Sequence, residues 1–269
     1  MRKCRIKAAR QAALLAALLA ASTAAQADSP FPLMRDIAGD RELPRPYGVG
    51  VDFFTLNQGY DIDELTFSLP GVGGVDTSVI DVENQAWEGD LKFDVWVLPF
   101  LNVFGIFGHI SGDTAVDLSA VPLALPVPLG TLDIDYSGQV YGGGATLAFA
   151  GEHWFTSLTG TYAKSNLNGD FDSEVDSVTW QPRVGYINGA WALFVGGYYI
   201  DAEETHEGAI ALPGLGSVPF AVKLESDTNF SPSAGVYYRF TDHAEATLEL
   251  GGGNGRQTTL FNFTWRFGG

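Results

Sequence analysis

The fold is decided by residues 257–267, which read QTTLFNFTWRF close to the end of the chain. Side chains in a β-strand alternate between two faces with a period of two. One face of this segment is therefore a row of aromatic rings, and the other is mostly polar. A strand in the wall of a membrane barrel needs this division, because lipid lies outside and water or packed polar groups lie inside. The aromatic face holds Phe261, Phe263, Trp265 and Phe267, and the opposite face holds Thr258, Leu260, Asn262, Thr264 and Arg266.

The same alternation recurs in several segments upstream, most clearly over residues 85–97, 178–186, 229–240 and 244–250. In the first of these, Trp87, Leu91 and Phe93 share one face, and a run of charged residues occupies the other. Isolated buried charges are expensive, so we expect the inward charges to pair with one another. The side chains predicted to point into the barrel are Asp52, Glu88, Asp90, Lys92, Asp94, Gln181, Arg183, Arg239, Glu245, Glu249 and Arg266.

Two strand-like segments do not assign cleanly to an inner and an outer face. Over residues 101–116, one parity is favoured by Phe104, Ile106 and Ile110, and the other by Phe107. Over residues 131–149, the apolar face of Ile134, Tyr136 and Val140 opposes a face that carries Asp133 and Asp135. Leu147 and Phe149 would join that apolar face only if a bulge lies at residues 142–144, where three glycines follow one another.

The connections between these segments alternate in length. Short ones lie near residues 99–100, 151–152, 188–189 and 241–243, and long ones near 61–80, 117–131, 166–174 and 205–221. Short turns at one end and long loops at the other are typical of outer-membrane barrels. The pattern predicts an all-β fold: a closed antiparallel transmembrane β-barrel of about ten strands, with both termini on the short-turn side.

The first 27 residues have the features of a secretory signal peptide. A basic start precedes a short apolar run, and Ala25-Gln26-Ala27 supplies the cleavage site. Residues 28–46 are rich in proline and charge and are expected to form an irregular periplasmic lead-in, followed by the barrel over residues 47–269. The single cysteine, Cys4, leaves with the signal peptide, which excludes a disulfide scaffold and a cysteine nucleophile in the mature chain.

Loss of the signal peptide leaves ten basic residues against 32 acidic ones. Such a chain repels nucleic acid, so no nucleic-acid partner is expected. A secreted soluble sandwich would also show alternation. The signal peptide, the loop asymmetry, the inward charged run and the aromatic residues near strand ends together favour the membrane barrel.

The chain from residue 28 onward resembles the broad class of small Gram-negative outer-membrane β-barrels. The last aromatic strand is similar to the C-terminal signal that their assembly machinery reads, although Gly268 and Gly269 follow it here. The resemblance implies an outer-membrane location, and outer-membrane lipid and the barrel assembly machinery as partners.

Three of the long connections contain uncharged, proline-bearing runs over residues 65–75, 118–130 and 209–222. Exposed apolar loops must pack on something, so these three either bury one another, capture an apolar solute or contact a partner. The leading interpretation is an outer-membrane protein that binds or passes a small apolar solute through an extracellular-loop vestibule; the alternatives are a structural or adhesive barrel and an outer-membrane lipid hydrolase. The candidate ligand-binding residues are Leu69, Val72, Leu123, Leu125, Val127, Leu212, Leu215 and Phe220.

Other chemistry has weaker support in the sequence. His109 and Ser111 share one strand face, and Asp133 or Asp135 could orient the histidine. This loosely resembles the His-x-Ser pairing of outer-membrane lipid deacylases, but no catalytic residue is assigned. An acidic run over residues 168–176 does not have EF-hand spacing and is interpreted as solvated charge. No metal site and no cofactor are expected.

Overall fold

The computed structural model describes residues 29–39, 41–67, 80–117, 119, 131–169, 172–212, 216–226 and 229–268. One eleven-stranded sheet dominates these residues, and every adjacent pair of strands is antiparallel. A short 3₁₀ turn, η1 (Arg35–Ala38), precedes it. The strands are β1 (Tyr47–Phe67), β2 (Asp81–Leu98), β3 (Leu101–Asp117), β4 (Thr131–Ala150), β5 (Trp154–Gly169), β6 (Asp172–Asn188), β7 (Trp191–Leu212), β8 (Gly216–Ser226), β9 (Phe230–Arg239), β10 (Ala244–Gly253) and β11 (Arg256–Phe267).

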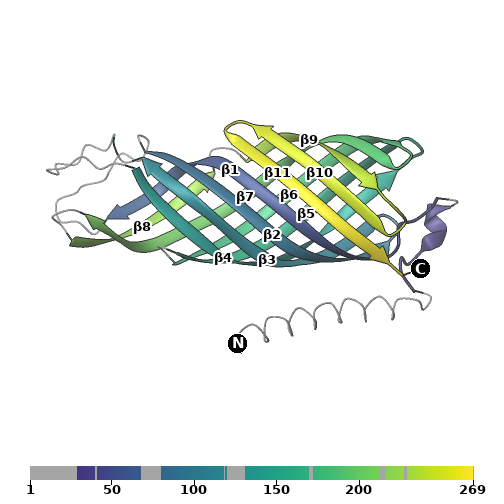
Figure 1. Cartoon of the computed structure of the whole chain (residues 1–269), viewed down its shortest axis with the longest axis horizontal. Helices are drawn as coiled ribbons and strands as arrows, with labels where there is room; N and C mark the ends of the chain where they lie inside the picture. Colours follow the sequence, from purple (N-terminus) through teal and green to yellow (C-terminus); the bar gives the residue numbers. More distant parts are fainter. Residues whose placement is uncertain are drawn as a thin grey trace, which may run out of the picture.

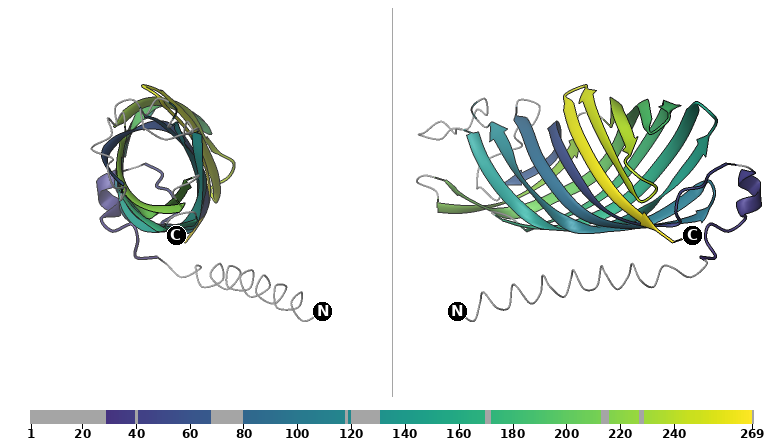
Figure 2. Two further views of the ribbon diagram at one scale, coloured as in Figure 1. Left: turned by 90° about the vertical axis from the view of Figure 1, so that its left-hand side faces the viewer. Right: turned by 45° about the vertical axis from the view of Figure 1, so that its right-hand side comes forward.

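The sheet closes on itself because β1 pairs with β11 over twelve residue positions, from Tyr47↔Phe267 to Gln58↔Arg256. Ten strands, all except β8, therefore form a ring, which is visible end-on in Figure 2. The strands are strongly tilted, and both the lead-in and the C-terminus lie at the end with the short turns (Figure 1). The predicted closed antiparallel barrel of about ten strands is confirmed.

The outer part of the barrel is closed differently, by β8. From Tyr47 to Gln58, β1 pairs with β11, and from Tyr60 to Phe67 it pairs with β8. In the same way, β7 pairs with β9 over residues 191–199 and with β8 over residues 204–212. Strand β8 therefore occupies the space between β7 and β1 that the shorter β9, β10 and β11 leave open, and it gives both of these long strands a partner.

This arrangement corrects two of the predicted long loops. The connection predicted at residues 166–174 is mostly strand, since β5 runs to Gly169 and β6 starts at Asp172. The one predicted at residues 205–221 is an antiparallel pair, β7 with β8. Both segments extend neighbouring hairpins beyond the ring, where backbone pairing satisfies their polar groups.

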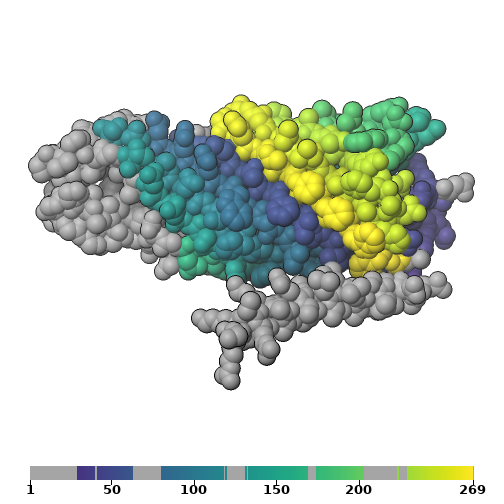
Figure 3. All heavy atoms as spheres, viewed as in Figure 1, coloured from purple at the N-terminus to yellow at the C-terminus, as the bar shows by residue number. Residues whose placement is uncertain are grey.

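The outer face of the wall is apolar, as the closing strand predicts. Phe261 and Trp265 of β11 are exposed, whereas Thr264 and Arg266 are buried. The space-filling view in Figure 3 shows β11 beside β1 on this face. Large exposed apolar side chains continue around the ring and include Phe53, Trp87, Phe93, Phe107, Phe149, Trp180, Tyr186, Leu193 and Leu248.

An apolar outer face around a closed ring is the arrangement that a lipid bilayer requires, because every backbone group in the wall finds a partner within the sheet. Among the described residues, no helix is long and apolar enough to cross a membrane. The chain is an outer-membrane β-barrel of the Gram-negative type, with the short turns on the periplasmic side.

The lead-in packs against the periplasmic end of the ring. The Leu33 amide donates to the Val97 carbonyl at 2.8 Å, and the Arg45 side chain donates to the Gly268 carbonyl at 3.2 Å. The ring of Phe31 meets that of Tyr47 edge to face. The residues before position 29, which include the predicted signal peptide, lie outside the described part of the chain.

Candidate functional site

A cavity of about 320 Å³ lies inside the barrel, roughly midway along the lumen. The interior of a membrane barrel is usually polar, but a belt of apolar side chains from several strands lines this one. Its volume is at the lower end of the range for small-molecule sites. The apolar belt consists of Phe54, Leu56, Phe104, Ile106, Ile110, Val140, Leu167, Ile200 and Leu260.

Strand β3 shows why the sequence pattern did not place this belt on the inner face of the barrel. Phe104, Ile106 and Ile110 face the cavity, and Phe107 faces outward. Strand β4 pairs with β3 without a register shift, so no bulge lies at residues 142–144. The apolar face that includes Val140, 1% exposed, is therefore the inner one, whereas Leu147 and Phe149 are on the outside.

Two layers of side chains lie between the cavity and the outer end of the barrel. The first is polar: the amide of Asn84 donates to the Thr114 hydroxyl at 2.9 Å and to the Tyr136 hydroxyl at 3.0 Å. The second is apolar and buried, with Ile62 and Val82 among its members. Outside the polar layer, the inner face of β1 and β2 is thus apolar.

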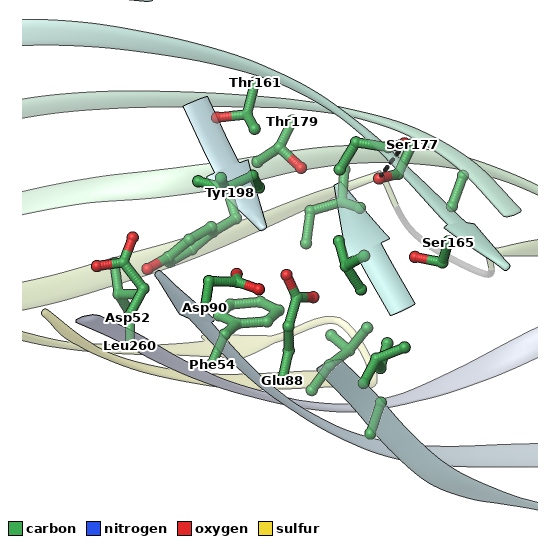
Figure 4. Close-up of a pocket in the computed structure, with 18 of the residues that line it drawn as sticks. Asp52, Phe54, Glu88, Asp90, Thr161, Ser165, Ser177, Thr179, Tyr198 and Leu260 are labelled. Atoms are coloured by element: carbon green, nitrogen blue, oxygen red, sulfur yellow. Dashed lines mark hydrogen bonds between the residues drawn. The ribbon is translucent and has the colours of Figure 1, made fainter. Parts of the chain in front are cut away.

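The periplasmic side of the cavity carries the charged residues of β1 and β2. Asp52 and Asp90 are cross-strand partners, and Glu88 and Lys92 share the inner face of β2 with Asp90. Figure 4 shows the carboxylates of Glu88 and Asp90 directed into the space enclosed by the strands, beside Phe54. The Lys92 ammonium lies 3.8 Å from the Asp52 carboxylate and 4.6 Å from the centre of the Phe104 ring.

On the opposite wall, Arg183 of β6 forms an ion pair with Glu249 of β10. The Arg183 Nε donates to Glu249 Oε2 at 2.9 Å, and the same oxygen accepts from Gln181 at 3.2 Å. The other oxygen accepts from the Ser233 hydroxyl at 2.6 Å. Glu249 is 0% exposed, so its charge depends entirely on these donors.

A second polar network lies in the lumen nearer the periplasm, and we call Asp94, Asn102, Tyr237, Glu245 and Arg266 the periplasmic plug. The Arg266 guanidinium donates to Asp94 at 2.9 Å and to Glu245 at 2.6 Å. Asn102 donates to Asp94 at 2.6 Å, and Tyr237 donates to Glu245 at 2.8 Å. These residues come from β2, β3, β9, β10 and β11, and both Arg266 and Asp94 have Gly48 of β1 as their cross-strand partner, so the network follows one side of the lumen wall.

We expect Gly108→Ala to lower the free energy of unfolding by about 1–3 kcal/mol, the usual cost of overpacking. A Cβ at Gly108 would lie 1.9 Å from Asp90 Oδ1 and 2.2 Å from the Gly89 carbonyl oxygen. The matched control is Gly252→Ala, where a Cβ meets nothing within 4 Å. Urea titration of the refolded barrel in detergent micelles measures both. Equal stability of the two variants would contradict the placement of Asp90 over Gly108.

The structure places most of the predicted interior charges in these networks. Arg239 is the exception: it ends β9, and its side chain is 45% exposed at the periplasmic rim, 3.9 Å from Glu42. At the last position of a strand, the side chain reaches water beside the turn. The residues placed within the lumen are Glu88, Asp90, Lys92, Asp94, Arg183, Glu245, Glu249 and Arg266.

The predicted loop vestibule falls largely outside the described part of the chain. Leu69, Val72, Leu123, Leu125, Val127 and Leu215 lie in segments that are not described. Leu212 is the last residue of β7, and Phe220 lies on β8, where its backbone pairs with Phe67 and Gly208. The structure therefore brings none of these residues together as side chains.

The candidate hydrolase residues are not arranged for catalysis. His109 is exposed on the outer face and stacks edge-on against Trp87. The Ser111 hydroxyl donates to the Tyr136 carbonyl at 3.5 Å. Position 109 pairs with Gln139, four residues from Asp135 along β4 and six from Asp133, so neither carboxylate lies beside the histidine.

The acidic run of β6 is partly neutralised by its neighbour on β5. Lys164 pairs with Glu174 and lies 3.7 Å from Asp176, whose carboxylate also accepts from the Tyr162 hydroxyl. Within the described residues, no three acidic, histidine or cysteine side chains converge in a way that could hold a metal ion.

Comparisons with known proteins found matches among solved structures only. An outer-membrane channel from Pseudomonas putida F1 is 14% identical, with a TM-score of 0.39 over 84% of this chain and 98% of that one. The outer-membrane protein OprG from Pseudomonas aeruginosa is 10% identical, with a TM-score of 0.45 over 84% and 98%. The toluene transporter TbuX from Ralstonia pickettii is 10% identical, with a TM-score of 0.30 over 84% and 90%. No protein-family model and no curated protein matches the chain.

Proposed function

We propose that this barrel takes up a small, mostly apolar molecule from the cell exterior and holds it in the lumen cavity. The observation that carries the proposal is the apolar belt inside the barrel. A lumen that conducts water and ions has no use for Ile106, Ile110 and Val140 on its inner surface, and exposing them to water is costly. A bound apolar molecule would cover these side chains.

The layers along the lumen support a direction for uptake. From the outer end inward, the lumen carries apolar Ile62 and Val82, the polar layer of Asn84, Thr114 and Tyr136, the apolar belt, and then the charged residues on the periplasmic side. The periplasmic plug then places further charged side chains in the lumen beyond the cavity. An apolar molecule therefore meets a favourable surface from outside and an ionic barrier toward the periplasm.

Filling the cavity should abolish binding. We expect Ala163→Phe to remove measurable affinity for 2-phenylethanol, because Ala163 lines the cavity and a phenyl ring there occupies the ligand's volume. Isothermal titration calorimetry on the purified barrel in detergent measures the dissociation constant. Ala234→Phe is the control, since Ala234 is exposed and alternates along β9 with buried Ser231 and Ser233. Wild-type protein that binds no such compound, or Ala163→Phe that binds it unchanged, would contradict the proposal.

A further inference from the structure

The charges that face the cavity do not balance. Three carboxylates line it, those of Asp52, Glu88 and Asp90. Of the basic side chains that reach it, Arg183 is bonded to Glu249, and Lys92 lies 3.8 Å from Asp52. Lys92 also acts on Asp90, two positions away on the same face of β2, so three acids share one ammonium group.

Asp90 is the most constrained of the three acids. It is 8% exposed, and its Oδ1 atom is buried without a hydrogen-bond partner among the described residues. Such a group ordinarily costs free energy unless something donates to it. Tyr198 lines another wall of the same cavity, and its buried hydroxyl lies near the Arg183–Glu249 ion pair. Figure 4 shows both residues facing the enclosed space.

The apolar belt adjoins these acids directly. Glu88 has Phe54 as its cross-strand neighbour on β1 and Ile110 on β3, and both side chains line the cavity. Two residues further out on the same face of β2, Ala86 pairs with Leu56. A carboxylate pair at one end and hydrocarbon at the other is the complement of a molecule with a positive charge on an apolar body.

A bare metal ion fits this arrangement less well than an ammonium group. No three acidic or histidine side chains in the described residues are placed to coordinate a metal. A hard cation such as calcium takes six to eight oxygen ligands, whereas an ammonium group has three donors and needs only a few acceptors. The apolar surroundings of Glu88 also suit a ligand that brings its own hydrocarbon.

We propose that the cavity recognises a small molecule that carries one protonated amine on an apolar body. This inference rests on the proposed function and names its ligand class. The ammonium group donates to the carboxylates of Asp90 and Glu88, and the apolar part lies against Leu56, Ile110 and Val140. The amine supplies a second positive charge for the three acids that otherwise share Lys92.

The test compares 2-phenylethylamine, which is protonated at neutral pH, with the neutral 2-phenylethanol by isothermal titration calorimetry on the full barrel in detergent. We expect the wild type to bind the amine about tenfold more tightly than the alcohol, the range for a hydrogen bond to a charged group. Asp90→Asn, nearly the same in shape, should remove that preference by weakening binding of the amine about tenfold. Glu83→Gln, the same charge change at an exposed position on β2, should alter neither affinity.

Each result decides a separate point. Equal affinity of the wild type for amine and alcohol, or an Asp90→Asn variant that keeps the preference, overturns the amine proposal alone. If neither compound binds the wild type, the proposed function fails as well. Tight binding of calcium chloride alone that Asp90→Asn abolishes would replace the amine site with a metal site. If Asp90→Asn does not fold, as judged by heat-modifiable migration on a detergent gel, Glu88→Gln takes its place with the same expected results.

Discussion

Arg183→Met should lower the free energy of unfolding by about 3–5 kcal/mol, the cost of leaving one member of a buried ion pair without its partner. Glu249 is 0% exposed, and Arg183 is its only basic partner among the described residues. Gln181 and Ser233 would still donate to Glu249, but neither carries a positive charge. Urea-induced unfolding of the refolded barrel in detergent micelles measures the change.

The double variant Arg183→Met/Glu249→Leu separates the ion pair from the volume that it fills. Replacing both members of a buried pair by apolar residues is often nearly neutral, so the double variant should recover most of the lost stability. Lys164→Met is the exposed control: its partners Glu174 and Asp176 are solvent-accessible, and its loss should cost less than about 1 kcal/mol. If Arg183→Met is no less stable than Lys164→Met, Glu249 does not depend on this pair.

The wall of the barrel could be predicted because its inner and outer faces differ in polarity. Over residues 87–95 of β2 and 261–266 of β11, large apolar side chains face outward and polar ones face inward, so the period of two gives both the strand and its orientation. The short turns were equally clear. They join strands at the periplasmic end, where two or three residues suffice for an antiparallel connection.

The cavity could not be predicted because its lining is apolar, which is also the feature that makes it a candidate site. Where the lumen itself is apolar, both faces of a strand carry apolar residues, as at Phe53 and Phe54 on β1 or Ile106 and Phe107 on β3. The alternation then carries no information about orientation. The site could have been found from neighbouring strands whose two faces are both apolar at the same level. That pattern indicates an apolar interior.

The ion pairs inside the lumen could not be predicted from the sequence, because they depend on the register of the strands around the ring. Arg183 and Glu249 are 66 residues apart, and Arg266 and Asp94 are 172 apart. Sequence reasoning placed these residues inside, but their pairing depends on barrel closure and strand tilt. Strand β8 was missed because the uncharged run at residues 209–222 contains prolines, which are uncommon inside sheets. Strand β8 pairs with the parts of β1 and β7 that extend beyond β9, β10 and β11.

The periplasmic plug leads to the second large effect: Asp94→Ala/Arg266→Ala should raise ion conductance in planar bilayers several-fold over a low wild-type value. Arg266 links Asp94 to Glu245 along the inner wall, where these long side chains occupy the lumen, and the side chains of Arg266 and Asp94 are only 10% and 2% exposed. The plug fits closely, since a Cβ at Gly48 would lie 2.0 Å from Asp94 Oδ2. Removing both charges together empties this volume without leaving either of them unpaired.

The conductance measurement also tests how a ligand would leave the cavity. Lys164→Ala/Asp176→Ala removes an exposed pair at the outer end of the barrel and should leave conductance unchanged. A large stable conductance in the wild type would show that the plug does not close the lumen, and an unchanged double variant would show that the barrier lies elsewhere. If the prediction holds, a molecule in the cavity reaches the periplasm only when the bonds from Arg266 to Asp94 and Glu245 break. These two ion pairs then set the rate of release, because the apolar part of the ligand has no contact to gain until they separate.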